Sequence, residues 1–342
     1  MTAEQVDALD AVAVIGAGAW GTSLACVLGE RYREVTLWVY EAGLAKDMAH
    51  TRENAVYLPG AKLPRTVHPT SSLDEAVRGK ELAIIVVPSH VFRGIIGQAA
   101  PSLAAGVTLV SATKGLEVTS LCTMSQIMRE VLTPVHRPRI SVLSGPSFAR
   151  EVVDRRPTAV VAAADDPAIA RRVQRALSGG TLRVYAGTDP LGVELGGAIK
   201  NVIAIAAGIV DGLALGTNPR AALVTRGLAE MTRLGVAMGA EARTFAGLAG
   251  MGDLILTCTG DLSRNRTLGR KLAGGARPAD LVAGSRTVAE GVNACRSVRR
   301  LAERHAVEMP ICATVHRVLF EGEDAREAVE RLMARGLRFE GE

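Results

Sequence analysis

The chain has 342 residues, and its 48% hydrophobic, 22% charged and 3% aromatic content is typical of a globular protein of about two domains. The net charge of +5 mildly favours an anionic partner, but the basic residues are dispersed and few aromatics could stack on bases, which argues against nucleic acid. Five cysteines without a CxxC spacing argue against a disulfide framework and a zinc site. We therefore expect a reducing compartment, the cytoplasm, and no metal.

The N-terminal region predicts a dinucleotide-binding unit. The apolar run 11–15 is suited to a central parallel strand, and it leads directly into the GxGxxG motif GAGAWG at residues 16–21. A helix over 22–28 and a second strand over 34–41 complete a βαβ unit. The glycines allow a tight turn and close backbone approach, and the amides at the start of the helix can hold a pyrophosphate.

Glu41 lies at the end of the second predicted strand. A carboxylate there can accept hydrogen bonds from the ribose hydroxyls of NAD and would repel the additional phosphate of NADP. Arg52 lies not far along the chain and could offset that repulsion, so these residues favour NAD only modestly. The alternative is that Glu41 is an ordinary surface charge.

Further strands are expected in the first domain, at residues 82–87, 107–112, 140–143, 158–164 and 182–186, with a helix at 167–178. Ligands collect at the carboxyl ends of strands in doubly wound sheets. Lys114 follows one of these strands and could hold a substrate anion or hydroxyl, and the turn SGPSFA at 144–149 could receive a ligand oxygen. Taken alone, each is equally a solvated loop feature. We place the end of this domain at residue 188.

Strand signals nearly vanish after residue 188, and helices are expected at 193–215, 219–238, 242–248 and toward residue 337, so domain 189–342 is predicted to be all-helical. Lys200 and Asn201 lie inside an alanine-rich apolar stretch, where burying an ammonium and an amide is costly without specific partners. The stretch approaches membrane-spanning length, yet its polar residues, Glu194, Lys200, Asn201 and Asp211, would be expensive in hydrocarbon. We therefore expect a buried helix and no membrane span.

Two polar loops are predicted between the helices, at residues 250–258 and 263–266. The planar fork of Arg264 can bind phosphate with two hydrogen bonds, while Ser263 and Asn265 supply neutral donors. A surface helix cap is the alternative for these residues. Residues 274–285 are predicted to form a flexible loop.

Six motifs in order resemble the NAD(P)-dependent glycerol-3-phosphate dehydrogenase family over nearly the whole chain: GAGAWG at 16–21, ATKG at 112–115, SGPSFA at 144–149, IKN at 199–201, GD at 252–253 and SRNR at 263–266. The resemblance implies a Rossmann-type doubly wound sheet followed by an all-helical domain like the C-terminal domain of 6-phosphogluconate dehydrogenase. It implies reversible hydride transfer between NAD(P)H and dihydroxyacetone phosphate, giving sn-glycerol 3-phosphate for phospholipid synthesis. By analogy with this architecture, a homodimer is a further expectation.

The resemblance also implies residue roles. Lys200 is the family's proton acceptor in the oxidation of glycerol 3-phosphate, with Lys114 nearby and Asp253 orienting it. The cofactor-binding positions are Gly16, Gly18, Ala19, Trp20, Gly21, Glu41, Lys114, Ala149, Arg264, Val288 and Glu290. The substrate-binding positions are Lys114, Gly145, Ser147, Lys200, Asn201, Asp253, Ser263, Arg264 and Asn265. A lysine buried near other cations has its ammonium form disfavoured, which suits it to act as a base near neutral pH.

The chain departs from the family pattern in the glycine motif and at the end of the second predicted strand. Ala19 and Trp20 occupy variable positions, and Tyr40 and Glu41 stand where bacterial members often have a basic residue or histidine, which puts NADP use in doubt. The β-hydroxyacid dehydrogenases share the two-domain plan, but they place the asparagine one helical turn after the catalytic lysine rather than next to it. The other alternative is a non-catalytic dinucleotide-binding sensor. Such a protein would not need the combination of Lys114, Lys200, Asp253 and Arg264.

Overall fold

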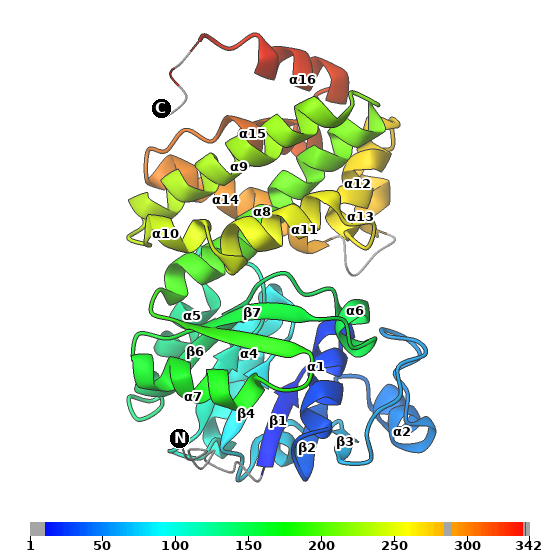
Figure 1. Cartoon of the computed structure of the whole chain (residues 1–342), viewed down its shortest axis with the longest axis vertical. Helices are drawn as coiled ribbons and strands as arrows, with labels where there is room; N and C mark the ends of the chain where they lie inside the picture. Colours follow the sequence, from blue (N-terminus) through cyan, green and yellow to red (C-terminus); the bar gives the residue numbers. More distant parts are fainter. Residues whose placement is uncertain (1–10, 284–288, 338, 340–342) are drawn as a thin grey trace. The chain divides into compact units, whose positions relative to one another are not determined.

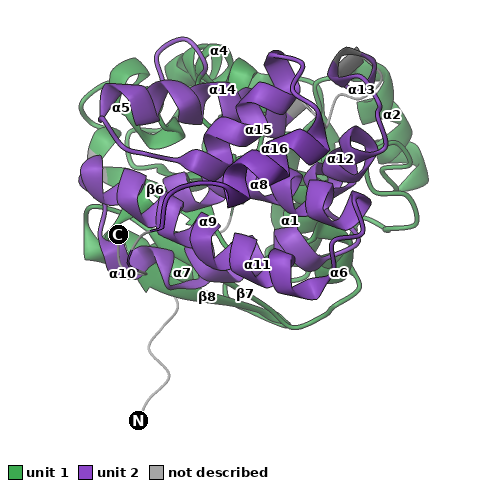
Figure 2. Cartoon of the chain, turned by 90° about the horizontal axis from the view of Figure 1, so that it is seen from above, with its two compact units in different colours: residues 1–117, 122–194 green, residues 118–121, 195–342 purple. Residues whose placement is uncertain are grey.

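The computed structural model describes residues 11–283, 289–337 and 339. The chain divides into two compact units (Figure 2). The first comprises residues 1–117 and 122–194, and the second comprises residues 118–121 and 195–342. The division between Glu194 and Leu195 falls inside helix α8 (Pro190–Gly212), whereas the boundary we predicted lies just before this helix, at residue 188.

The first unit contains an eight-stranded sheet in the order β3-β2-β1-β4-β5-β6-β7-β8 (Figure 1). The strands are β1 (Ala11–Ile15), β2 (Glu34–Trp38), β3 (Val67–Thr70), β4 (Leu82–Ile85), β5 (Thr108–Ser111), β6 (Ile140–Ser144), β7 (Thr158–Ala163) and β8 (Leu182–Gly187). Neighbouring strands are parallel except for β6 and β7. The central strands are continuous apolar runs because both faces of a parallel sheet are covered.

Helices pack on both faces of this sheet. They are α1 (Ala19–Gly29), α2 (Ala42–Thr51), α3 (Leu73–Val77), α4 (Ser89–Ala99), α5 (Met124–Val131), α6 (Ala149–Val153) and α7 (Pro167–Leu177), with short 3-10 turns at Ala100–Ser102 and Arg137–Arg139. Val12 and Val14 of β1 belong to one core cluster with residues of α1 and α7, whereas Ala13 and Ile15 belong to a second cluster with residues of α4 and α5. Since alternate residues of a strand face opposite sides, these two clusters confirm the predicted doubly wound sheet.

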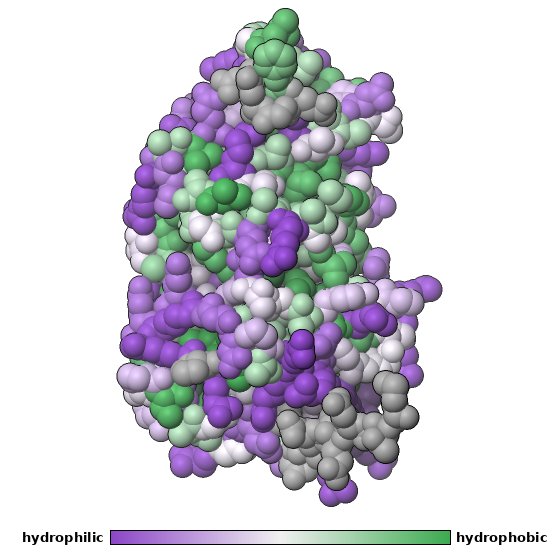
Figure 3. Space-filling model, turned by 60° about the vertical axis from the view of Figure 1, so that its left-hand side comes forward, coloured by the Kyte–Doolittle hydropathy of each residue, from purple (hydrophilic) through white to green (hydrophobic). Residues whose placement is uncertain are grey.

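The described part of the second unit is helical. Its elements are most of α8, then α9 (Thr217–Ala237), α10 (Ala242–Phe245), the π-helix η3 (Leu248–Gly252), α11 (Asp253–Thr259), α12 (Arg264–Ala273), α13 (Pro278–Ala283), α14 (Ala289–Arg304), α15 (Pro310–Phe320) and α16 (Ala325–Met333). Among the described residues, only α8 is long and apolar enough to cross a membrane, and its most apolar window is entirely buried inside the protein. This agrees with the buried helix that we predicted. The face shown in Figure 3 mixes hydrophilic and apolar residues.

The polar loops predicted in the second unit are wrong. Residues 250–258 lie in η3 and α11, and residues 264–266 form the first turn of α12. The predicted loop 274–285 contains α13, and its last two residues lie outside the described part of the chain. One of the glycines that suggested a loop, Gly250, instead allows close packing, because a Cβ on it would lie 2.1 Å from the carbonyl oxygen of Phe245.

Helices α8 and α12 contact each other directly through their backbones. A Cβ on Gly208 of α8 would lie 2.0 Å from the carbonyl oxygen of Arg266, and one on Gly269 of α12 would lie 2.0 Å from the carbonyl oxygen of Ile205. Real Cβ atoms do not approach other atoms so closely, so only glycine allows the two helices to come this near at both positions.

We expect Gly269→Ala to destabilise the protein by about 1–3 kcal/mol, because the added methyl group must push two helices apart. Gly94→Ala in α4 is the matched control, since no atom lies within 4 Å of the position of its Cβ. That change should raise the free energy of unfolding by up to about 1 kcal/mol through helix propensity. Urea denaturation curves measure both effects. Equal midpoints for the two variants would contradict the backbone contact.

Candidate active site

The glycine turn between β1 and α1 leaves open space at its centre. Gly16 has a φ of 118°, and a Cβ there would lie 2.5 Å from the carbonyl oxygen of Val86. A Cβ on Gly21 would lie 1.9 Å from the carbonyl oxygen of Gly16. By contrast, Gly18, the N-cap of α1, has no atom within 4 Å of its Cβ position and no capping side-chain hydrogen bond. The uncapped amides and open space fit the pyrophosphate of a dinucleotide.

Ala149 lies beside the helix that follows this turn. Ala19 and Trp20 are the first two residues of α1, and both are half-buried. Ala149 begins α6, and its carbonyl oxygen accepts a hydrogen bond of 3.1 Å from the hydroxyl of Ser23 in α1. The structure therefore brings Ala149 close to the glycine-turn helix, as a contact with a bound cofactor requires.

Lys114, Gly145 and Ser147 converge at the carboxyl edge of the sheet. Strands β1, β4, β5 and β6 are successive parallel neighbours, so the loops that follow them lie along one edge. The ammonium of Lys114 donates a hydrogen bond of 3.1 Å to the carbonyl oxygen of Gly145, and the hydroxyl of Ser147 donates one of 2.9 Å to the same oxygen. Gly145 adopts a φ of 141°, which side-chain-bearing residues rarely reach.

Glu41 follows β2, which ends three residues earlier than we predicted. Its carboxylate is half-buried and accepts a hydrogen bond of 2.8 Å from the hydroxyl of Tyr57. Arg52, which we considered as a cation that could offset its charge, instead donates hydrogen bonds to the carbonyl oxygens of Pro64 and Val67 at the edge strand β3. Tyr57 was missed in the sequence because nothing in its local pattern connects it to Glu41.

A buried ion pair forms the centre of the second unit. Lys200 of α8 is 6% exposed, and its ammonium donates hydrogen bonds to Asp253 Oδ1 at 2.5 Å and to Thr257 Oγ1 at 2.9 Å. Asp253 is the first residue of α11 and is 1% exposed. The ion pair with the Asp253 carboxylate makes up for the hydration that the Lys200 ammonium loses on burial. The partner of Lys200 in this unit is thus Asp253, the residue that we expected to orient it.

Thr257 is a second residue that the sequence did not reveal. Its hydroxyl accepts from Lys200 and donates to the carbonyl oxygen of Asp253 at 2.6 Å. Residues four apart on a helix lie on the same face, so the pairing of Asp253 with Thr257 would have followed from a helix. It was not apparent because we had assigned residues 250–258 to a loop.

The start of α12 is linked to α8 next to this ion pair. The amide of Asn265 donates a hydrogen bond of 2.9 Å to Asn201 Oδ1. The Oδ1 atom of Asn265 is buried and has no hydrogen-bond partner among the described residues. Ser263 is buried and caps α12 by accepting a hydrogen bond of 3.3 Å from the amide of Arg266. Arg264 is the first residue of the helix and is exposed to solvent.

The two remaining cofactor positions lie toward the C-terminus. Glu290 is half-buried in the first turn of α14. Val288 lies outside the described residues. The side-chain oxygen Oδ1 of Asn265 would lie 2.1 Å from a Cβ on Gly291, so Asn265 of α12 packs closely against the start of α14.

Cys258 lies close enough to this centre to raise the question of thiol chemistry. Burial raises the pKa of the Cys258 thiol to about 12, against the opposing influence of Lys200 and Arg266. The thiol is therefore protonated at neutral pH, and since only the thiolate is an effective nucleophile, Cys258 is a structural residue.

An open glycine turn on a Rossmann-type sheet, followed by a helical unit with a buried lysine and aspartate, defines the class of nicotinamide-dependent dehydrogenases. Two family models match the chain, the NAD-dependent glycerol-3-phosphate dehydrogenase N-terminus over residues 11–170 and the corresponding C-terminus over residues 189–330. The chain belongs to the NAD-dependent glycerol-3-phosphate dehydrogenase family.

Close relatives and a solved structure agree with this assignment. The glycerol-3-phosphate dehydrogenase, NAD(P)+, of Geobacter sulfurreducens is 57% identical over 96% of this chain and 98% of its own length. The enzyme of the same name from Koribacter versatilis is 51% identical over 95% of this chain and 97% of its own. The crystal structure of glycerol-3-phosphate dehydrogenase from Coxiella burnetii is 39% identical and superposes with a TM-score of 0.90, covering 96% of this chain and 99% of that one. The predicted family, fold and use of NAD or NADP are confirmed.

We expect Gly18→Ala to leave the first unit folded but to weaken NADH binding by about tenfold or more, because its methyl group would occupy the space needed by the pyrophosphate. Gly94→Ala is the matched control, since it also has no atom within 4 Å of its Cβ position but lies in the middle of α4. Quenching of NADH fluorescence measures the affinity, and thermal unfolding checks the fold. Wild-type affinity in the Gly18 variant would remove the turn from the cofactor site.

Proposed function

We propose that the protein catalyses the reversible reduction of dihydroxyacetone phosphate to sn-glycerol 3-phosphate with NADH or NADPH. The observation that carries the proposal is the use of two adjacent residues of α8. Lys200 forms the buried pair with Asp253, and Asn201 binds Asn265 at the start of α12, beside Arg264. One helix therefore holds both a proton donor and the element that we assign to phosphate binding. The relatives named for this activity support the assignment.

The residues of the first unit would hold the cofactor. Those assigned to the pyrophosphate are Gly16, Gly18, Ala19, Trp20 and Gly21, and those assigned to the rest of the cofactor are Glu41, Lys114, Ala149, Arg264, Val288 and Glu290. When bound, the nicotinamide supplies or accepts the hydride. Tyr57 holds the carboxylate of Glu41 in place and Arg52 is engaged elsewhere, which supports a preference for NAD.

Lys200 acts as the proton donor in reduction. As the central carbon of the substrate receives a hydride, the ammonium gives a proton to the carbonyl oxygen, and in the reverse direction the amine takes the hydroxyl proton. Asp253 and Thr257 hold the ammonium in a fixed direction through their two hydrogen bonds. Lys114 would place a second positive charge near the substrate oxygen, where negative charge develops.

The remaining substrate residues would bind and orient. Arg264 can form two hydrogen bonds with the phosphate, and the positive end of the α12 dipole favours an anion there. Ser263 and Asn265 are assigned to the same phosphate region, and Gly145, Ser147 and Asn201 to the body of the substrate. Binding energy at the phosphate would position the carbonyl group for reaction.

The proposal also covers the domain bounds, the oligomeric state, the compartment and the metabolic role of the enzyme. We place a cofactor domain at residues 1–188 and a substrate domain at 189–342, and we infer a homodimer that works in the cytoplasm and supplies glycerophospholipid synthesis. The family resemblance supports these statements, and sedimentation of the purified protein would test the dimer.

The function is tested by following the oxidation of NADH and of NADPH with dihydroxyacetone phosphate and with a simple keto acid. We expect turnover only with the triose phosphate, faster with NADH because the Glu41 carboxylate disfavours the extra phosphate of NADPH. Turnover only with the keto acid would indicate a β-hydroxyacid dehydrogenase. Cofactor binding without any turnover would indicate a sensor.

Replacing Lys200 by alanine should lower kcat by about 10²–10⁴-fold and leave NADH affinity nearly unchanged, since general acids contribute about that much. Lys46→Ala, at an exposed lysine of α2, is the matched control and should behave as wild type. Because Lys200→Ala leaves Asp253 buried without its cation, a Lys200→Ala/Asp253→Asn double variant should recover stability but not activity. An equal loss of NADH affinity and kcat would reject Lys200 as the proton donor.

A further inference from the structure

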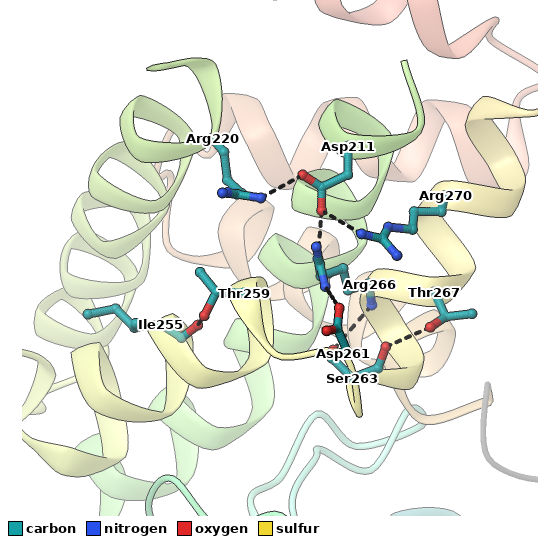
Figure 4. Close-up of polar contacts among 9 residues, drawn as sticks. All are labelled: Asp211, Arg220, Ile255, Thr259, Asp261, Ser263, Arg266, Thr267 and Arg270. Carbon is teal, nitrogen blue, oxygen red and sulfur yellow. Dashed lines mark hydrogen bonds and ion pairs between the residues drawn. The ribbon is translucent and has the colours of Figure 1, made fainter. Parts of the chain in front are cut away.

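Asp211 lies one residue before the end of α8 and gathers arginines around a single carboxylate (Figure 4). Its side chain is 9% exposed. Its Oδ1 atom accepts a hydrogen bond of 3.0 Å from Arg220 of α9, and its Oδ2 atom accepts one of 2.6 Å from Arg266 of α12. Arg270, one turn further along α12, lies 3.8 Å from Oδ2. The single carboxylate of Asp211 thus forms ion pairs with three guanidinium groups.

Arg266 is the closest of these partners to the substrate residues. Its side chain is 7% exposed, and it also donates a hydrogen bond of 2.9 Å to Asp261, which is 90% exposed and lies just before the helix cap. Burial alone would lower the pKa of Arg266, but its hydrogen bonds to Asp261 and Asp211 raise that pKa above its ordinary value. Arg266 therefore stays charged and joins α8 to the turn that begins α12.

Two neighbouring residues of α12 consequently reach α8 at two separate places. Asn265 binds Asn201, and Arg266 binds Asp211, ten positions further along α8. At the rise of an α-helix these two partners are about 15 Å apart along the α8 axis. Between them lies the backbone contact of Gly208 and Gly269. Attachment on both sides of a close contact fixes how α12 is rotated against α8.

Rotation of α12 matters because its first turn carries the phosphate-binding residues. Arg264 is exposed, and no carboxylate among the described residues forms an ion pair with it. The three arginines near Asp211, by contrast, each form an ion pair with its carboxylate. If the carboxylate lost its charge, Arg266 would keep only its ion pair with the exposed Asp261, and the first turn of α12 would lose one of its two side-chain links to α8.

We propose that Asp211 is a positioning residue for the substrate phosphate: it anchors Arg266, and through it the start of α12, so that Arg264 and Asn265 face the phosphate. This inference rests on the proposed function, in which Arg264 and Asn265 bind that group. Asp211 itself touches neither substrate nor cofactor in this role.

The test is Asp211→Asn, which keeps the size of the side chain and removes its charge. We expect kcat/KM for dihydroxyacetone phosphate to fall about tenfold relative to kcat/KM for dihydroxyacetone, the analogue without phosphate, because a charged hydrogen bond is worth about that factor. The loss should appear in KM for the phosphorylated substrate, with kcat and KM for NADH changed by less than about threefold. A purely structural role would lower the rates with both substrates equally, and that result would overturn the inference.

Three further variants make the comparison sharper. Asp261→Asn removes the exposed partner of the same arginine and should change the selectivity less than about twofold. Asp211→Glu restores the carboxylate and should recover much of the lost affinity. In an Arg264→Ala background, the loss of selectivity caused by Asp211→Asn should be smaller than in the wild type, because both changes act on the same phosphate group. Full additivity in that double variant would contradict action through Arg264.

Two outcomes separate this inference from the function on which it rests. If Asp211→Asn fails to fold, Arg266→Lys replaces it, since a single ammonium cannot bond both aspartates in the way that the guanidinium does, and it should produce the same selective loss. Wild-type protein without turnover of dihydroxyacetone phosphate would reject the proposed function, and this inference with it. Wild-type turnover combined with unchanged selectivity in the variants would reject the inference alone.

Discussion

Helix α8 is buried over most of its length, and every polar side chain on it therefore needs a partner inside the protein. Each such partner fixes another element. Lys200 fixes the start of α11 through Asp253, Asn201 fixes the start of α12 through Asn265, and the carboxylate of Asp211 binds arginines of α9 and α12. The hydrogen bonds and ion pairs that these buried polar groups require thus also hold the candidate active-site residues in place.

Two other buried carboxylates, Glu230 and Glu194, are also satisfied by hydrogen bonds, but neither is assigned a part in the reaction. Glu230 of α9 accepts hydrogen bonds from the amides of Ile311 and Cys312 and so caps α15. Burial raises the pKa of Glu230 to about 7, although these amides oppose the shift. Burial likewise raises the pKa of Glu194, which accepts from the amide and hydroxyl of Ser125 within the first unit. The carboxylates of Asp211 and Asp253 differ in that their partners include the charged side chains of arginine and lysine, so each of them forms ion pairs between helices.

The sequence predicted the elements whose apolar pattern is continuous. The central strands and α8 have this pattern because they are buried on all sides. The edge strand β3 was missed because it is short and contains Pro69, which a strand tolerates only where a ladder hydrogen bond is absent. The helices around Gly250 were missed because a glycine that permits close packing has the same local signature as one in a turn.

The sequence likewise predicted only part of the candidate active site. The glycine turn could be derived from the residues because its function depends on spacing along the chain. Phosphate binding by Arg264 was inferred from its neighbours Ser263 and Asn265, whereas the role assigned to Asp253 depended on the family resemblance. Thr257 and Tyr57 were not found, because each acts through a partner that comes near it only in the fold. Asp211 was noticed only as a charge too costly for a membrane, and its arginines come from two other helices.

The adjacency of Lys200 and Asn201 has a geometrical consequence that separates this chain from the β-hydroxyacid dehydrogenases. Successive residues on an α-helix point about 100° apart, whereas residues one turn apart point the same way. Lys200 can therefore face α11 while Asn201 faces α12, so two adjacent residues of α8 contact two different elements. An asparagine one turn later would lie over the lysine and would not reach a second helix. The adjacent pair thus suits a substrate whose reacting carbon and phosphate must be held at once by different elements.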